Sequence, residues 1–206
     1  DDKPFYEYFT ERRVLTPLDS LPPNLVQALI ATEDREFYNH WGVRWTAILR
    51  AVIVNFQEGR RAQGGSTITQ QLARKLFLTP ERTLERKIKE WLMSIKLERS
   101  YSKNEILEMY FNINYYGAGA YGIGAAAQTY FGKSPGDLDM MESAVLVGVL
   151  PAPSAYSPLR NPDLARQRRN TVLRSLVAIG QLDASAFDTL SQTEIVLHQP
   201  EAGAYG

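Results

Sequence analysis

Three carboxylates, one arginine, one histidine and three aromatic rings crowd into residues 31–42. General acid–base chemistry needs a carboxylate that is partly desolvated yet reachable, because desolvation raises its basicity. Glu33 follows Leu25 and Leu29 at helical spacing, so we expect it where a buried helix face ends. The pattern marks Glu33 as a candidate base. The alternative is that Glu33 and Asp34 begin a solvated loop, because perturbed carboxylates also occur in structural ion networks.

A second candidate, an anion site, lies in the stretch Gly64-Gly65-Ser66-Thr67-Ile68-Thr69-Gln70-Gln71. Glycines allow backbone amides to approach an anion closely, and the N-terminus of the helix expected there favours negative charge. The stretch is not a nucleotide P-loop, because no Gly-Lys-Ser/Thr follows at the required spacing. Glycine-rich turns before helices are common, so the stretch alone does not establish a phosphate site.

Two cations and a carboxylate share one polar sector of a later predicted helix. Arg86 and Glu90 are four residues apart, and Lys87 and Glu90 are three apart, so their side chains can meet. One interpretation is a surface ion pair, which would contribute about 0.3–0.5 kcal/mol. The functional interpretation is a carboxylate presented together with two cations.

Composition sets the limits on the elements that must position these residues. The chain has 206 residues, of which 44% are hydrophobic, so we expect a packed core in one large domain or in two lobes. Lysine plus arginine equal aspartate plus glutamate at 23 each, which argues against a nucleic-acid partner. The absence of cysteine excludes disulfides and thiolate metal sites. Neither a membrane span nor a signal peptide is visible, so we expect an excised piece of a longer protein.

Hydrophobic periodicity predicts about eight helices and almost no strand, which is an all-α domain. An extended segment or short strand is expected over residues 1–13, a loop rich in glycine and tyrosine over 114–122, and a strand plus linker over 195–206. Caps and prolines predict where helices begin. The predicted starts are Pro22-Pro23, Thr79-Pro80, Ser102 with Glu105, Asp139 with Glu142, and Asn161-Pro162.

Two helix faces are strongly apolar. In the helix expected after Pro80, the apolar side chains share one face; they are Leu84, Ile88, Trp91, Leu92 and Ile95. The segment 45–56 is apolar and is flanked by arginines. It predicts either a core helix or a helix lying in a membrane interface with its arginines toward lipid phosphates.

These motifs together resemble the peptidoglycan glycosyltransferase domain of glycosyltransferase family 51, and within it the glycosyltransferase half of a bifunctional class A penicillin-binding protein. Five blocks carry the resemblance, in the family's order, over most of residues 24–180. They are Glu33 to Gly42, Gly64 to Gln71, Arg86-Lys87-Ile88-Lys89-Glu90-Trp91, Lys103 to Asn112, and the region around Leu150-Pro151-Ala152-Pro153.

The resemblance implies a mainly α, lysozyme-like fold in two lobes, a larger head and a smaller membrane-proximal jaw. The glycosyltransferase domain would span 19–192, with the jaw at roughly 43–80. Residues 1–18 would follow a missing transmembrane helix, and 193–206 would lead to a missing C-terminal transpeptidase domain. The implied location is the extracytoplasmic (periplasmic) face of the bacterial inner membrane, with the jaw in the outer leaflet.

The implied reaction polymerises lipid II into β-1,4-linked glycan. The growing lipid-linked glycan is the donor, undecaprenyl diphosphate leaves, and the 4-hydroxyl of the incoming lipid II attacks C1 with inversion. Direct displacement is consistent with a base that activates the nucleophile opposite the leaving group. The family requires no cofactor in this sequence but leaves room for a divalent cation, Mg²⁺ or Mn²⁺, at the diphosphate.

Family roles transfer residue by residue. Glu33 matches the general base and Glu90 a second glutamate, which would orient the diphosphate directly or through a metal. Substrate-binding or site-shaping positions are Asp34, Phe37, His40, Gly65, Ser66, Thr67, Gln70, Gln71, Arg74, Arg86 and Lys87. One departure is visible: the family often has Lys-Asn where this chain has Arg74-Lys75. Arg74 keeps the charge, whereas Lys75 carries no side-chain amide.

Other classes of function stay open. A lysozyme-like hydrolase or lytic transglycosylase would share the fold and one glutamate, but it would not need Arg86 and Lys87, because its leaving group is a sugar hydroxyl. A non-catalytic module that binds glycan or lipid would need no pair of carboxylates.

Overall fold

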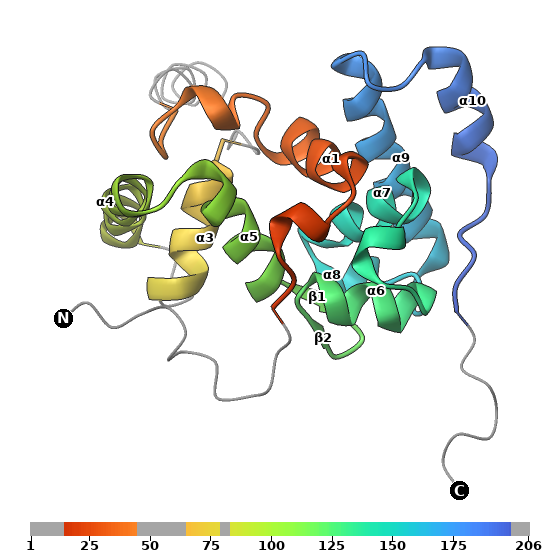
Figure 1. The fold of residues 1–206 in the computed structure, drawn as a ribbon, viewed down its shortest axis with the longest axis horizontal. Helices are drawn as coiled ribbons and strands as arrows, with labels where there is room; N and C mark the ends of the chain where they lie inside the picture. Colours follow the sequence, from red (N-terminus) through yellow and green to blue (C-terminus); the bar gives the residue numbers. More distant parts are fainter. Residues whose placement is uncertain (1–14, 45–64, 79–82, 199–206) are drawn as a thin grey trace, which may run out of the picture.

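The computed structural model describes residues 15–44, 65–78 and 83–198. Within these residues the chain forms nine α-helices, three short 3₁₀ helices and one antiparallel hairpin (Figure 1). The mainly α-helical prediction is confirmed. The α-helices are α1 (Pro23–Glu33), α3 (Ile68–Phe77), α4 (Leu84–Ser100), α5 (Lys103–Ile113), α6 (Ile123–Phe131), α7 (Met140–Val149), α8 (Pro153–Tyr156), α9 (Pro162–Ala178) and α10 (Ala184–Gln192). The 3₁₀ helices are η2 (Leu18–Ser20), η3 (Phe37–Asn39) and η4 (Pro135–Asp137).

Reciprocal capping boxes begin three of these helices. The predicted boxes of Ser102 with Glu105 at α5 and of Asp139 with Glu142 at α7 are confirmed. A third box joins Thr67 and Gln70 at α3. In each box the two side chains accept two backbone N–H groups that the first helical turn would otherwise leave unpaired, so residues three apart fix the start of each helix.

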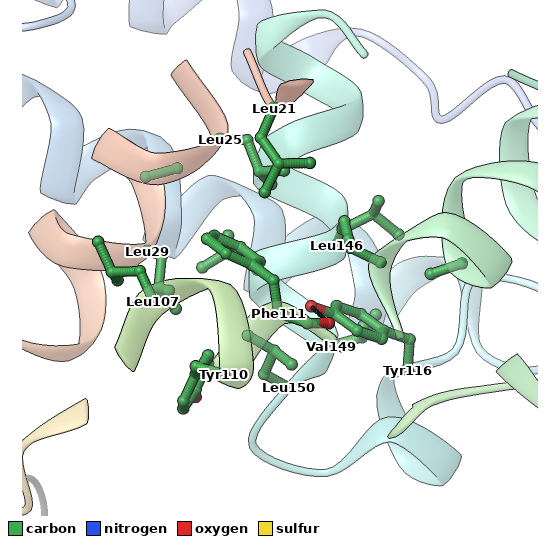
Figure 2. Close-up of a cluster of buried hydrophobic side chains, with 14 of the residues drawn as sticks. Leu21, Leu25, Leu29, Leu107, Tyr110, Phe111, Tyr116, Leu146, Val149 and Leu150 are labelled. Carbon is green, nitrogen blue, oxygen red and sulfur yellow. Dashed lines mark hydrogen bonds between the residues drawn. The ribbon is translucent and has the colours of Figure 1, made fainter. Parts of the chain in front are cut away.

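The core lies where α1, α5 and α7 meet. Leu25 and Leu29 of α1, Phe111 of α5 and Leu146 of α7 are completely buried in it (Figure 2). On one side α1 packs against α7 and α9, and on the other α3 packs against α4 (Figure 1). Helix α5 contacts α3, α4 and α6, and so it connects the two groups of helices.

Three predictions about elements are wrong. Helix α4 begins at Leu84 rather than at Pro80, because the side chain of Thr83 accepts the N–H of Arg86 and caps the helix there. The expected loop over 114–122 contains a hairpin, β1 (Tyr115–Gly117) with β2 (Ala120–Tyr121). Residues 195–198, the described part of the stretch that was expected to begin as a strand, form no strand.

Several predictions lie wholly or partly outside the described residues. These are the extended segment 1–13, the apolar segment 45–56, and much of the jaw at 43–80. The boundaries 1–18, 19–192 and 193–206 stay predictions. Within the described residues, none of the helices has the length and apolar character that crossing a bilayer requires. The apolar face of α4 does not enter the core, since Leu84, Ile88 and Leu92 are exposed.

Candidate active site

Glu33 is the last residue of α1 and is half-buried. Its Oε2 accepts a hydrogen bond of 2.8 Å from Nε2 of Gln71 on α3. Glu33 therefore does not begin a solvated loop, and the structure brings two sequence-predicted site residues from different helices together. A half-buried carboxylate with one oxygen held by an amide has the form expected of a general base.

Asp34 and His40 hold the first block in place. The buried Oδ2 of Asp34 accepts the Nε2–H of His40 at 2.8 Å and the backbone N–H of Ile68, at the start of α3, at 3.0 Å. Nδ1 of His40 accepts the N–H of Gly42, which assigns the proton to Nε2. A carboxylate at a helix N-terminus also complements the helix dipole. Asp34 thereby joins the end of α1 to the start of α3.

Lys103 and Glu98 also hold the first block in place, which the sequence did not reveal. Nζ of Lys103 donates to the carbonyl of His40 at 2.6 Å and to Glu98 at 2.8 Å, and it lies 4.5 Å from the centre of the buried Phe37 ring. Glu98 also accepts the hydroxyl of Thr69 at 2.5 Å. Lys103 stands in the fourth family block, but His40 lies 63 residues away in sequence, so spacing could not reveal that contact.

Glu90 is completely buried on α4 and faces two cations. Lys87 donates to one carboxylate oxygen, and Nη1 of Arg86 lies 3.4 Å from the other. Nζ of Lys87 also donates to the hydroxyl of Ser66 at 3.1 Å. The interpretation as a surface ion pair is wrong, because a buried carboxylate depends on its partners far more than an exposed one does.

The segment 66–71 lies between the two glutamates. Ser66 at its start contacts Lys87, the partner of Glu90, and Gln71 at its end contacts Glu33. Thr67 and Gln70 are buried in the α3 capping box, and the Thr67 hydroxyl donates to the Gly42 carbonyl at 2.5 Å. These two residues shape the segment rather than face solvent.

The remaining predicted residues sit at the edges of this arrangement. Gly65 is exposed, and a methyl group there would meet no atom within 4 Å, so the backbone at this position has open space around it. Arg74 on α3 is half-buried. The next residue, Lys75, donates to Oδ1 of Asn114, and burial, followed by the charge of Arg74, lowers its pKa. Gly64 lies outside the described residues.

The described carboxylates and histidines of this site do not by themselves form a metal centre. The described residues contain no group of three or more histidine or acidic side chains placed to hold an ion. The oxygens of Glu90 face Lys87 and Arg86. A divalent cation at this place would have to compete with both cationic side chains for the one carboxylate.

Comparison with known proteins identifies the family. The family model described as "Transglycosylase" matches residues 1–177. The chain belongs to this family. The transglycosylase domain is 49% identical over 178 residues to penicillin-binding protein 1A of Aquifex aeolicus, covering 86% of this chain and 24% of that protein. It is 48% identical over 198 residues to penicillin-binding protein 1A of Escherichia coli, covering 95% of this chain and 23% of that protein.

A crystal structure of penicillin-binding protein 1A from Haemophilus influenzae resembles the transglycosylase domain described here. The TM-score is 0.55 at 25% sequence identity, and the match covers 93% of this chain and 19% of that chain. The chain thus spans about a quarter of the length of these relatives. The resemblance inferred from the five sequence blocks is confirmed, and so is the fold that it implied.

Proposed function

We propose that this transglycosylase domain is an inverting peptidoglycan glycosyltransferase that polymerises lipid II in bacterial cell-wall synthesis. The observation that carries the proposal is the pairing of one half-buried glutamate with two half-buried cations, held by the buried Glu90, across the segment 66–71. Glu33 meets Gln71 at one end, and Lys87 meets Ser66 at the other. A hydrolase that expels a sugar hydroxyl would use the glutamate but would have no need of the cations.

Glu33 acts as the general base in this proposal. Its Oε2 is held by Gln71, so Oε1 takes the proton from the 4-hydroxyl of lipid II. The oxygen of that hydroxyl forms a new bond to C1 of the donor glycan, and the bond from C1 to the diphosphate oxygen breaks with its electron pair. Attack opposite the leaving group inverts C1 and gives the β-1,4 linkage.

Arg86 and Lys87 stabilise the departing undecaprenyl diphosphate, and Arg74 of α3 adds a third positive charge for it. The bridging oxygen gains charge as the bond breaks, and fixed cations at that place lower the barrier. Arginine suits bidentate contact with phosphate oxygens. Glu90 holds Lys87 and Arg86 in position from the buried side.

The cellular setting follows from the reaction. Lipid II and the growing glycan are lipid-linked, so the domain would work at the extracytoplasmic face of the bacterial inner membrane, with its jaw in the outer leaflet. Exposed Leu84, Ile88 and Leu92 on α4 are consistent with an apolar environment on that side. The protein would also carry its own transmembrane helix and a transpeptidase domain.

Incubation with purified lipid II tests the proposal. We expect glycan polymer from the unaltered protein and none from Glu33→Gln, which keeps the shape of the side chain but removes the base. Glu85→Gln on α4, where the carboxylate is exposed and pairs with Lys89, is the matched control and should polymerise normally. Released muropeptides would indicate a hydrolase, and binding without product would indicate a binding module. Near-normal polymer from Glu33→Gln would refute the assigned base.

A further inference from the structure

A buried tyrosine hydroxyl stands behind Gln71. Tyr110 of α5 is 1% exposed, and its hydroxyl donates to Oε1 of Gln71 at 2.8 Å. Nε2 of the same amide donates to Glu33 at 2.8 Å. Side chains from α5, α3 and α1 therefore form one continuous line of hydrogen bonds that ends on the carboxylate.

The buried end of this line of hydrogen bonds determines which group donates and which accepts at each step. A buried hydroxyl must find an acceptor, and in this line that acceptor is the carbonyl oxygen of the Gln71 amide. Burial and the charges of Glu33 and Tyr116 raise the pKa of Tyr110 well above its ordinary value, and Arg74 lowers it by less. The hydroxyl thus stays neutral and keeps its proton. With its oxygen bound to Tyr110, the amide must turn its NH₂ group toward Glu33.

A second connection fixes the distance between the helices. The backbone carbonyl of Tyr110 accepts Nδ2 of Asn114 at 2.6 Å, and Oδ1 of Asn114 accepts Nζ of Lys75. Lys75 is one helical turn beyond Gln71 on α3. Tyr110 is consequently tied to α3 through its side chain and, by way of Asn114, through its backbone, so α5 is held against α3 at two places here.

We propose that Tyr110 is a positioning residue for the transfer reaction: it locks the Gln71 amide in the one orientation that donates to Oε2 of Glu33 and leaves Oε1 to receive the proton. This inference rests on the proposed function and adds to it. Without the hydroxyl, the amide is free to rotate by half a turn. Its oxygen would then face the carboxylate, and two facing acceptors repel unless Glu33 is protonated.

Tyr110→Phe tests this role, because phenylalanine fills the same volume and removes only the hydroxyl. We expect kcat/KM for lipid II to fall about tenfold, as loss of one hydrogen bond implies, mostly through kcat. The acidic limb of the pH–rate profile should move to higher pH, since Glu33 would hold its proton more tightly. Tyr130→Phe is the control. It also removes a buried hydroxyl, which donates to the Tyr116 carbonyl at 2.9 Å, and it should leave the acidic limb in place.

A double-mutant cycle separates positioning from a general structural effect. Gln71→Met removes the intermediate group and should move the acidic limb in the same direction as Tyr110→Phe. Adding Tyr110→Phe to Gln71→Met should then change nothing further, because the hydroxyl would have no amide left to orient. Additive losses, or an acidic limb that stays in place in Tyr110→Phe, would overturn the proposal.

Titration of Glu33 by carbon NMR of its carboxyl group gives a readout that needs no turnover. We expect its pKa to rise in Tyr110→Phe and in Gln71→Met but to stay the same in Tyr130→Phe. If the unaltered protein made no polymer while this shift occurred, the proposed function would fail and the link from Tyr110 to Glu33 would stand. If polymer formed and no shift occurred, only the link would fail.

Discussion

Lys87 is the residue through which α4 reaches the segment in front of α3. Its ammonium group donates to Glu90, which is fully buried, and to the hydroxyl of Ser66. A lysine between a buried carboxylate and a polar segment is held in one place, so its charge is available there without reorganisation. That property is what a departing diphosphate needs from a cation.

Replacing Lys87 by methionine should therefore impair turnover more than folding. Methionine keeps the length of the side chain but cannot stabilise charge, and Arg86 still pairs with Glu90. We expect kcat/KM for lipid II polymerisation to fall by about 100-fold, the usual cost of removing one group that stabilises developing charge. Lys89→Met, at an exposed position that pairs with Glu85, is the control. Equal rates in the two variants would remove Lys87 from the catalytic cluster.

The lowered pKa of Lys75 makes the stability of the folded state depend on pH. Burial and Arg74 lower its pKa below the ordinary 10.5, so the folded state loses this proton at a lower pH than the unfolded state does. The unfolded state binds more protons between the two pKa values, and stability there rises with pH. Urea denaturation from about pH 8 to pH 10 should show this contribution in the unaltered protein and not in Lys75→Asn. Lys96→Asn, at an exposed site on α4, should keep it.

The catalytic candidates could be predicted from the sequence, but their supports could not. Glu33 and Glu90 lie in motifs of a few residues, where residue type and spacing are visible. Tyr110 and Lys103 act on Gln71 and on His40, which are 39 and 63 positions away. Such partners are decided by how α5 packs against the rest of the molecule, and no local pattern encodes that packing.

At the scale of elements, a capping box of four residues can make a helix start visible in the sequence. The starts of α5 and α7 were predicted correctly for this reason. The hairpin was missed because its strands are only three and two residues long, too short for an alternating pattern. What defines it is the positive φ of Gly117 and Gly119 and the stacking of Tyr115 on Tyr121 at 4.7 Å.

Gly42 ends the first block, and adding one methyl group there should strongly reduce the stability of the fold. Its φ is +79°, and a Cβ there would lie 2.9 Å from the Ser94 carbonyl of α4. We expect Gly42→Ala to lower the free energy of unfolding by about 3 kcal/mol, from the left-handed backbone and the overlap together. Gly119→Ala isolates the backbone part, because Gly119 has a φ of +78° and open space around it. It should cost about 1–2 kcal/mol, and an equal loss in both variants would show that the overlap is relieved.

At the scale of the whole molecule, the two groups of helices meet at the end of α1 and the start of α3. Asp34 and Gln71 cross this boundary by hydrogen bonds, and α5 packs against both sides. Periodicity predicted the helices but not their arrangement, which came from the resemblance to the family. Contacts between residues distant in sequence determine the arrangement, whereas periodicity reports only which face of each helix is apolar.

The C-terminal part of the described chain depends on one buried arginine. Arg169 of α9 is fully buried, and its guanidinium donates to the backbone carbonyls of Ser191 and Thr193 at 3.0 and 2.6 Å and to the side chain of Asn170. It thereby fastens the end of α10 to α9. Lysine keeps the charge but lacks the planar fork that serves three acceptors at once.

Arg169→Lys should therefore lower the free energy of unfolding by about 2–3 kcal/mol, since buried acceptors lose their donors. Arg166→Lys, three residues earlier at an exposed position, should change it by no more than about 0.5 kcal/mol. Urea denaturation measures both variants. Because the lost bonds join α10 to α9, amide hydrogen exchange should accelerate in α10 before it does in α1 or α7. Uniform acceleration across all helices would mean that Arg169 supports the core as a whole rather than the attachment of α10.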